Sequence, residues 1–562
     1  MKPSAEKNGR SLLLITALAL LGLISSCKSG STESEKRVDA DSVLLARNPM
    51  ALDFDTAELS MIRPGLEDLI RSYEQIRKIS IDNSVLPAVQ FNPVPEGFVV
   101  PADKGHVSWP IPGDVDMPEN RNELAFMSIP ELASLLRQKK ISSVELTTFF
   151  LDRLKKYDPE LHCVITLTEQ YALEQAARAD SELAAGTDRG ILHGIPYGVK
   201  DLFAFPGYKT TWGAGAYADQ VIDTKATVIA RLEEAGAVLL AKLTLGELAM
   251  GDIWFADTTR NPWNLDEGSS GSSAGSASAT AAGLVPFAIG TETWGSIVSP
   301  STRCGVTGLR PTYGRISRYG AMALSWSMDK AGPICRSASD CAIVFDAIRG
   351  SDGKDPMVTD AAFDYNPGLD LSTLRVGYLK EAFNEDYNNK KQDEETLKTL
   401  RKMGIRPVPV SLSTDIPVNA LSIILEAEAA AAFDELTRSN RDSLLVQQNN
   451  YSWPNIFRTA RYISAVEYIQ ANRLRSLLIE DVNRIMSEVD VLVTPSFGGN
   501  QLLMTNLTGQ PVVVVPNGFD RKGSPTSISF LGNLYDEATI LFFAGKYQEA
   551  TGFDEQHPPL FK

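Results

Sequence analysis

Histidine is scarce in this chain. Its 562 residues contain four histidines, His106, His162, His193 and His557. Zinc sites and Ser-His-Asp triads draw on histidine, so little material is left for either. The sequence also lacks clusters with metal-ligand spacing and a nucleotide-binding glycine loop. We therefore expect neither a metal ion nor a cofactor.

Excess positive charge is missing as well. The chain has 54 Lys and Arg against 70 Asp and Glu, a formal net charge of -16. Nucleic-acid grooves need clustered Lys and Arg, so this balance predicts no nucleic-acid partner. Hydrophobic residues make up 43% of the chain, which is enough to bury a large core.

An apolar run long enough to span a bilayer is not found near the N-terminus. Lys2, Lys7 and Arg10 precede an uncharged apolar run of only 13 residues, Leu12–Ile24. This pattern is typical of a secretory signal. The small residues before Cys27 resemble a bacterial lipobox, which makes Cys27 a predicted lipid attachment site. The alternative is an ordinary signal peptide. Both predict export to the bacterial periplasm or cell surface, the first with a lipid anchor in the membrane.

Cysteine is also rare. Besides Cys27 the chain contains Cys163, Cys304, Cys335 and Cys341. An exported protein permits disulfides, and four cysteines allow three pairings, so the pairing stays open. In a domain of this size we expect them to be buried apolar residues without a catalytic role.

Composition divides the chain into three parts. We assign residues 1–27 to the signal and 28–120 to a tether and a helical N-terminal extension. Apolar spacing from Asp55 to about Lys78 predicts one or two amphipathic helices. Six prolines between Phe91 and Pro118 favour an extended segment. Residues 121–562 form the predicted main domain.

The main domain is predicted to have an α/β fold. Ser128–Glu131 and Ser142–Glu145 match the capping box of a helix start. Residues 223–235 predict a helix, and Ala237–Ala241 a strand. The segments Val376–Leu379, Glu394–Met403 and Ile405–Val410 repeat the strand, helix, strand order. Such alternation predicts a mixed, largely parallel central sheet covered by helices, and residues 415–485, including Ile423–Leu436, are predicted mostly helical.

The segment Gly268–Pro300 is rich in glycine, serine and alanine and nearly uncharged. Small residues let backbone amides approach a ligand closely, which suits a site for a developing anion. A flexible linker is the alternative. Against it, Ala277–Ala282 predicts a helix and Leu284–Ile289 a strand.

One candidate nucleophile in this segment is Ser273. Gly271–Gly275 matches G-x-S-x-G, the nucleophile elbow of α/β-hydrolases. That mechanism needs a later histidine, and only His557 follows, in a proline-rich tail. An esterase using Ser273 and His557 is therefore an alternative function.

A second interpretation rests on longer motifs in a fixed order. They are Gly194–Phe203, Asn261–Asn264, the glycine and serine loop, Gly290–Ile297, Cys304–Arg315, Gly509–Pro511 and Pro516–Gly518. Over roughly residues 123–555 the chain resembles the amidase signature family, serine hydrolases of carboxamides. The resemblance implies the amidase signature fold and hydrolysis of a carbon-nitrogen bond.

Position by position, the resemblance implies a relay of Lys200, Ser272 as bridging serine and Ser296 as nucleophile. It also implies a cis peptide bond before Ser272, and an oxyanion hole from the backbone N–H groups of Thr293, Trp294, Gly295 and Ser296. Physical chemistry agrees, because a lysine acts as a base only when neutral and burial favours that form. The alternative for Lys200 alone is a snorkelling lysine or a lysine salt-bridged to the adjacent Asp201. The alternative for Ser296 alone is a helix N-cap, and that for Ser272 alone is a loop hydroxyl that bonds its neighbours.

The chain also departs from the family pattern. The family commonly has glycine where this chain has Ser270 and Ala274, and often glycine or aspartate at Trp294. Backbone donors survive these changes, whereas Trp294 is expected to wall the acyl pocket or narrow it. Glu292 replaces the commoner aspartate, a form that resembles amidases of the peptide-amidase type. Asp329 and Arg336 match another family segment, where we expect support of the fold rather than chemistry.

The sequence thus predicts an exported amidase acting on a small-molecule or peptide amide through an acyl-enzyme. Two further alternatives are the amide-hydrolysing component of the tRNA-dependent amidotransferase and a non-catalytic surface binding protein. The substrate and the oligomeric state stay open.

Overall fold

A computed structural model describes residues 56–76, 78–79, 81–87, 89–102 and 105–562. The predicted signal, Cys27 and most of the tether lie outside these residues. The chain divides into two units, residues 1–80 and 81–562. Residues 81–120, which composition assigned to the extension, thus group with the main domain. No helix among the described residues is both long and apolar enough to cross a membrane.

The second unit is built on an eleven-stranded sheet with the order β1-β3-β2-β6-β8-β7-β12-β13-β11-β9-β10. Its strands are β1 (Val164–Leu167), β2 (Pro196–Lys200), β3 (Val238–Leu243), β6 (Phe287–Glu292), β7 (Thr307–Arg310), β8 (Lys330–Cys335), β9 (Val376–Leu379), β10 (Val408–Val410), β11 (Val491–Pro495), β12 (Val512–Phe519) and β13 (Pro525–Gly532). A hairpin of β4 (Arg260–Asn261) and β5 (Asn264–Gly268) stands apart.

The sheet is mixed, as predicted, but parallel pairing is less extensive than expected. Within the described sheet, four strand pairs are parallel: β2 with β3, β2 with β6, β9 with β10 and β9 with β11. The other six pairs are antiparallel. The predicted strand, helix, strand units lie near the two ends of the sheet, whereas β8, β7, β12 and β13 pair antiparallel between them. Periodicity in the sequence does not show how those middle strands pair.

Helices cover the sheet. They are α3 (Ile129–Arg137), α4 (Ser143–Leu161), α5 (Glu169–Ala184), α6 (Thr227–Glu234), α7 (Ala274–Ala281), α8 (Val298–Cys304), α9 (Ala338–Ile348), α10 (Lys380–Asn384), α11 (Lys390–Lys402), α12 (Ile423–Ala432), α13 (Asp434–Arg438), α14 (Trp453–Ala460), α15 (Ala465–Met486), α16 (Gln501–Thr508) and α17 (Glu537–Thr551). In the first unit, Thr56–Ile76 forms one helix, α2.

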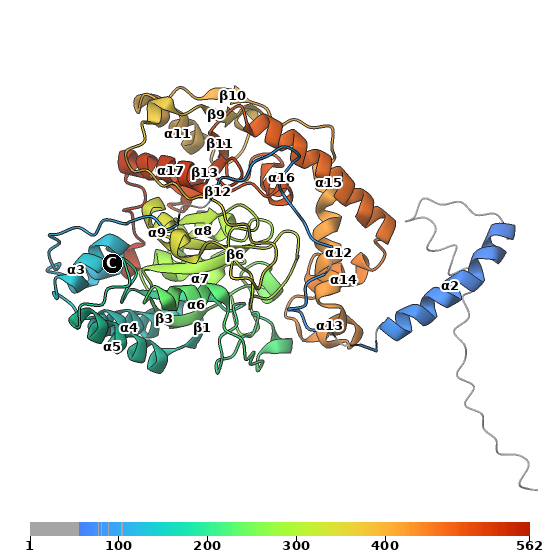
Figure 1. The fold of residues 1–562 in the computed structure, drawn as a ribbon, viewed down its shortest axis with the longest axis horizontal. Helices are drawn as coiled ribbons and strands as arrows, with labels where there is room; N and C mark the ends of the chain where they lie inside the picture. Colours follow the sequence, from blue (N-terminus) through green and yellow to red (C-terminus); the bar gives the residue numbers. More distant parts are fainter. Residues whose placement is uncertain (1–55, 77, 80, 88, 103–104) are drawn as a thin grey trace, which may run out of the picture. The chain divides into compact units, whose positions relative to one another are not determined.

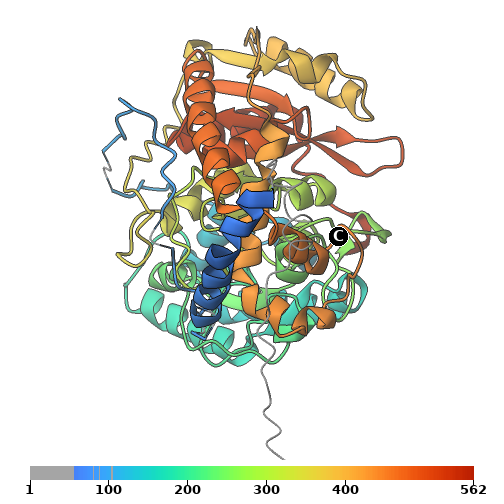
Figure 2. The ribbon, with the colours of Figure 1, turned by 90° about the vertical axis from the view of Figure 1, so that its right-hand side faces the viewer.

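The helices fall into groups. α6, α9 and α17 pack in one row against the sheet, and α4, α7 and α8 pack in another. Every residue of β2, β3, β8, β11 and β13 is buried, so these strands are covered on both faces, as continuous apolar strands require. Helices α12, α14 and α15 pack together beside the sheet, where Figures 1 and 2 show them in orange.

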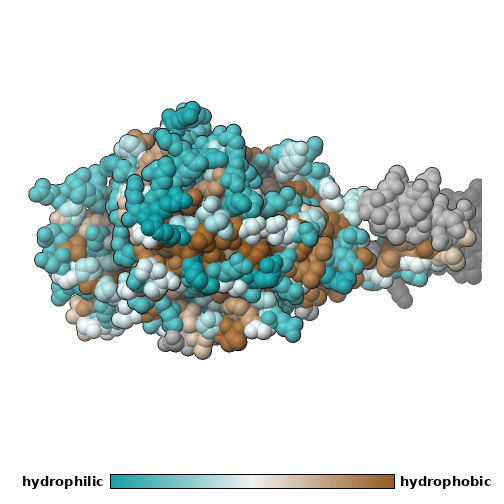
Figure 3. Space-filling view, turned by 90° about the horizontal axis from the view of Figure 1, so that it is seen from above, coloured by the Kyte–Doolittle hydropathy of each residue, from teal (hydrophilic) through white to brown (hydrophobic). Residues whose placement is uncertain are grey.

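Local signals in the sequence set the starts of two helices. Ser128 and Ser142 each form the predicted capping box, with Glu131 and Glu145. The helix predicted over Ile423–Leu436 is instead two helices, because Phe433 leaves the helical conformation between α12 and α13. The face shown in Figure 3 carries many hydrophilic residues, with apolar residues between them.

Candidate active site

The bridging-serine loop lies between β5 and α7. The peptide bond Gly271–Ser272 is cis, as the resemblance implies. The loop packs tightly, since a Cβ added at Gly271 would lie 1.7 Å from the carbonyl oxygen of Gly251. Asp252 accepts a hydrogen bond from the N–H of Ser270 at 2.7 Å. The loop is therefore held by its neighbours and by the 251–252 turn.

Lys200, the last residue of β2, lies fully buried under this loop. Its Nζ is 2.8 Å from Ser272 Oγ, 2.9 Å from Thr291 Oγ1 and 3.1 Å from Ser273 Oγ. Its partners are thus hydroxyl groups, together with the carbonyl oxygen of Thr291 at 3.5 Å. Burial lowers the pKa of Lys200 to about 7, although the charges of Asp329 and Glu292 act in the opposite direction. A neutral amine is therefore accessible near pH 7.

Asp201 does not pair with Lys200. Consecutive residues of a strand point to opposite faces, and Asp201 Oδ1 lies 2.7 Å from Nζ of Lys242 on β3. The N–H of Thr211 donates to the other oxygen of Asp201 at 2.8 Å. The structure thus removes the salt-bridge alternative for Lys200.

Ser296 lies in the turn between β6 and α8. The N–H of Ser273 donates to the carbonyl oxygen of Ser296 at 3.1 Å, which joins this turn to the bridging-serine loop. Ser296 is mostly buried, at 8% exposure. Among the described residues, no protein group makes a hydrogen bond with its hydroxyl. That hydroxyl is therefore available to a substrate.

Glu292 fixes the shape of the turn. It accepts hydrogen bonds from the N–H groups of Ile297 at 2.9 Å and Val298 at 3.0 Å, at the start of α8. Its other oxygen meets Arg310 Nη1 and Asn506 Nδ2, each at 2.8 Å. Burial opposes ionisation, but Arg310 and these donors outweigh it and lower the pKa of Glu292 to about 2. Glu292 is therefore an anionic anchor.

The amides just before the Glu292-bound N–H groups have no acceptor among the described residues of the protein. In the described part of the chain, no protein acceptor binds the N–H groups of Trp294, Gly295 or Ser296. Gly295 has a φ of +88°, a conformation that favours glycine. Trp294 is 44% exposed beside these amides. Backbone N–H groups without a protein acceptor next to a serine hydroxyl are candidate donors to a tetrahedral oxyanion.

Ser273 and His557 are not brought together. Ser273 is fully buried; its Oγ donates to the carbonyl oxygen of Thr291 at 3.0 Å and accepts from the N–H of Thr291 at 3.1 Å. The ring of His557 stacks on Phe126, with centroids 4.0 Å apart. Ser273 thus supports the loop, and the contacts of His557 lie elsewhere.

Other predicted features have structural roles. Cys163, Cys304, Cys335 and Cys341 are buried and free, as expected of apolar packing residues. Asp329 accepts from Thr293 Oγ1 at 2.6 Å and from the N–H groups of Leu324 and Ser325, so it ties the β6 turn to the 318–326 loop. Arg336 donates to the carbonyl oxygens of Met127 and Pro286. No cluster of metal-binding side chains is found in the described ranges.

Sequence reasoning missed several contacts. Thr291 lies inside a recognised motif, but nothing in the sequence marks it as a partner of Lys200. Asn506, which binds Glu292, and Asp252, which binds the Ser270 loop, lie in separate segments. Ser270, at a position where the family has glycine, places its Oγ 2.7 Å from that of Ser299 on α8. Residues two apart in a strand point to the same face, so strand alternation places Thr291 and Thr293 on one side of the β6 end. This alternation is the one sequence signal that could have marked Thr291 as a site residue.

The mixed sheet carries a buried lysine, a serine that follows a cis peptide bond and a second serine beside amides without a protein acceptor among the described residues. These are the features that the resemblance to the amidase signature family implies. The amidase family profile matches residues 145–504. The chain therefore belongs to the amidase signature family.

Known proteins of this family resemble the chain over most of its length. Identity is 37% over 482 residues with a glutamyl-tRNA(Gln) amidotransferase subunit of Marinomonas sp. (strain MWYL1), covering 77% of this chain and 99% of that one. The native peptide amidase of Stenotrophomonas maltophilia is 30% identical, with a TM-score of 0.71, over 78% of this chain and 100% of that one. A bacterial aryl acylamidase, 22% identical with a TM-score of 0.68 over 76% of this chain and 97% of that one, shares the fold.

Proposed function

We propose that this chain hydrolyses a linear carboxamide to a carboxylate and ammonia or an amine, through a relay of Lys200, Ser272 and Ser296. The supporting observation is the 2.8 Å contact between Lys200 Nζ and Ser272 Oγ in a fully buried position. Neutral Lys200 takes the proton of Ser272, and Ser272 takes the proton of Ser296 as Ser296 Oγ attacks the amide carbonyl carbon.

The tetrahedral intermediate places its oxyanion on the N–H groups of residues 293–296. Each such donor is typically worth about 3–4 kcal/mol of transition-state stabilisation. The carbon-nitrogen bond then breaks, and the relay returns a proton to the leaving nitrogen. Water hydrolyses the acyl-enzyme by the same relay. Ser272 and Ser296 share no hydrogen bond in the free protein, in keeping with catalytic contacts that tighten only around a substrate.

Labelling with a fluorophosphonate probe, followed by peptide mass mapping, tests this proposal. We expect modification at Ser296 that is lost on Lys200→Ala. Modification at Ser273 would contradict the relay and support the esterase alternative. A folded protein that stays unlabelled, also as Trp294→Gly, would support a non-catalytic binding protein.

A second candidate function is that of the amide-hydrolysing subunit of a tRNA-dependent amidotransferase. The 37% identity to the glutamyl-tRNA(Gln) amidotransferase subunit favours it. The excess negative charge and the predicted signal favour a free amidase. Ammonia release from glutamine at a rate above that from every other amide tested would support the amidotransferase function.

We also propose that the protein is exported and lipid-anchored at Cys27. The support is the sequence pattern alone, since residues 1–55 lie outside the described residues. Expression with the native N-terminus, membrane fractionation and mass spectrometry of the mature terminus test it. We expect a diacylglyceryl adduct that Cys27→Ser abolishes. A soluble mature protein would instead indicate an ordinary signal peptide.

A further inference from the structure

Helix α15 carries apolar side chains on both of its sides. The inner side packs against the core, where Leu478, Val482 and Met486 are buried. The outer side is exposed to solvent and carries Val466, Ile469, Leu474 and Leu477. The last three follow Val466 by three, eight and eleven positions, spacings that a helix of 3.6 residues per turn brings to one side. A surface helix normally places polar residues on that side, so an apolar outer side indicates an interaction surface.

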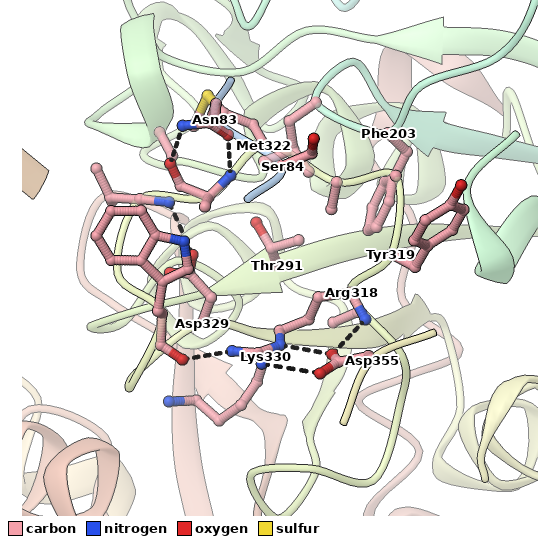
Figure 4. A pocket seen from close by; sticks show the side chains of 18 of the residues that line it. Asn83, Ser84, Phe203, Thr291, Arg318, Tyr319, Met322, Asp329, Lys330 and Asp355 are labelled. Carbon is pink, nitrogen blue, oxygen red and sulfur yellow. Dashed lines mark hydrogen bonds and ion pairs between the residues drawn. The ribbon is translucent and has the colours of Figure 1, made fainter. Parts of the chain in front are cut away.

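A second segment lies beside α15. We call residues 81–87 and 89–92 the entry segment, because the second unit begins with it. Asn83 Nδ2 donates to the carbonyl oxygen of Ala323 at 3.0 Å, and Asn83 Oδ1 accepts from the N–H of Ala323 at 2.7 Å (Figure 4). Farther along, the guanidinium carbon of Arg475 on α15 lies 3.5 Å from the centre of the Phe91 ring. The entry segment is therefore fixed to the second unit near both of its ends.

The entry segment extends the apolar surface of α15. Val85 and Val89 of this segment are 54% and 83% exposed. A groove of about 780 Å³ separates the two elements, with Val89 on one wall and Ile469 on the other. Figure 2 looks onto the side of the second unit on which α15 lies. We call Val85, Val89 and the four exposed apolar residues of α15 the apolar face.

One basic side chain lies within the apolar face. Arg473 is exposed and follows Val466 by seven positions, which places it on the same outer side of α15. It donates to Gln470 Oε1 at 2.9 Å and forms no ion pair with a carboxylate of the described residues. Arginine binds phosphate well, and its aliphatic stem covers apolar surface while its charge stays in water. Apolar side chains around an unpaired arginine are typical of a surface that lies at the headgroup level of a membrane.

The place where the chain enters the second unit indicates a lipid partner. Cys27, the predicted lipid attachment site, comes before the entry segment in the chain. An anchor at Cys27 therefore ties the second unit to the bilayer through the segment that carries Val85 and Val89. A bilayer also accepts an apolar helix side without a matching shape, whereas a protein partner needs shape complementarity.

We propose that the apolar face rests on the membrane that holds the predicted anchor, with Val466 and Ile469 among the acyl chains and the Arg473 guanidinium at a lipid phosphate. The inference rests on the export and lipid anchoring proposed above. Lipid attachment alone leaves the protein body free to turn about its tether, and a second contact fixes the side that faces the bilayer. Each aliphatic side chain that leaves water strengthens binding in proportion to its buried area.

Vesicle binding by a protein without its anchor tests this inference. The mature chain with Cys27→Ser carries no lipid, and sedimentation with vesicles of phosphatidylethanolamine and phosphatidylglycerol measures its partition coefficient. We expect this chain to bind the vesicles. Val466→Ser should lower the partition coefficient about tenfold, because it removes an aliphatic side chain that leaves water on binding. Leu477→Ser should act in the same direction.

Matched substitutions away from the apolar face serve as controls. Val408→Ser on β10 makes the same change at a valine of similar exposure, 52% against 63% for Val466. Leu560→Ser near the C-terminus matches Leu477→Ser in the same way, at 56% against 52%. Both controls should leave the partition coefficient unchanged. Circular dichroism verifies that each variant is folded.

Three outcomes overturn the inference. One is a Cys27→Ser chain that stays in the supernatant. Another is a Val408→Ser variant that loses as much binding as Val466→Ser. The third is a dimer in analytical ultracentrifugation that Val466→Ser abolishes while vesicle binding is unchanged, which would assign the face to a second copy of the chain. Vesicle binding combined with a native protein that has no adduct at Cys27 supports the membrane contact and refutes the anchor alone.

Discussion

Two lysines lie buried side by side in the sheet and differ in what their amines contact. Lys200 ends β2, and Lys242 lies on the neighbouring parallel strand β3, opposite Val199. Both side chains are fully buried. The amine of Lys200 meets hydroxyl groups, whereas the amine of Lys242 lies 2.7 Å from the carboxylate of Asp201.

We expect this difference to separate Lys200, the proposed base, from Lys242, a structural cation. Burial lowers the pKa of both lysines, but the Asp201 carboxylate counteracts this in Lys242. No carboxylate of the described residues contacts Lys200, so its pKa falls to about 7. Residue type and burial are the same, and the main difference is the carboxylate beside Lys242, which favours its charged form.

Replacement of Lys200 should give the largest effect on activity. Lys200→Met removes the base, and we expect kcat/KM to fall by about 10²–10⁴-fold, the range for general base catalysis. We expect the free energy of unfolding in urea to change little, because the substitution removes a buried amine that has no counter-ion. A variant that keeps a tenth of the activity would contradict the relay.

Replacement of Lys242 should act on stability instead. Lys242→Met leaves Asp201 charged, buried and without its cation, which typically costs about 3–5 kcal/mol. We expect a lower urea midpoint but normal kcat per active site, counted by fluorophosphonate titration. A loss of kcat in the folded fraction would show that the two lysines are not separate in function.

The pH profile follows from the Lys200 environment. The folded-state pKa is lowered from 10.5 to about 7, so the neutral base is lost as pH falls below 7. We expect kcat/KM to rise with pH up to about 7 and then to level off. Thr291→Asp places a carboxylate beside Lys200, in the way that Asp201 lies beside Lys242. We expect this variant to shift the pH at which kcat/KM rises upward by about 1–3 pH units. If the pH at which kcat/KM rises is the same in this variant as in the wild type, Lys200 is not the titrating base.

The features that could be predicted from the sequence are those that local signals or long ordered motifs encode. The capping boxes at Ser128 and Ser142 start their helices where expected. The resemblance placed the cis bond before Ser272, and the structure shows it there. Burial of Lys200 among apolar neighbours gave the direction of its pKa shift. Each of these depends on residues close in sequence or on a long motif.

Contacts between distant segments were not predictable. Asp201 is adjacent to Lys200 in sequence, yet strand alternation turns it to the other face and toward Lys242, 41 positions away. Nothing in the sequence before the proline-rich stretch predicts that Asn83 binds the backbone of Ala323, 240 residues away. The antiparallel pairing in the middle of the sheet was likewise hidden, because apolar runs do not report strand direction.

The smallest effect should come from removing both members of the Lys242 pair. Asp201→Asn keeps an oxygen that accepts from the N–H of Thr211, and Lys242→Met keeps the volume of the side chain. We expect the double variant to lie within about 1 kcal/mol of the wild type, because a neutral, filled replacement of a buried ion pair is often tolerated. Comparison with the Lys242→Met single variant in urea unfolding gives the coupling energy. A double variant as unstable as the single one would mean that Lys242 acts through its contact with Thr210, at 2.5 Å, and not through its charge on Asp201.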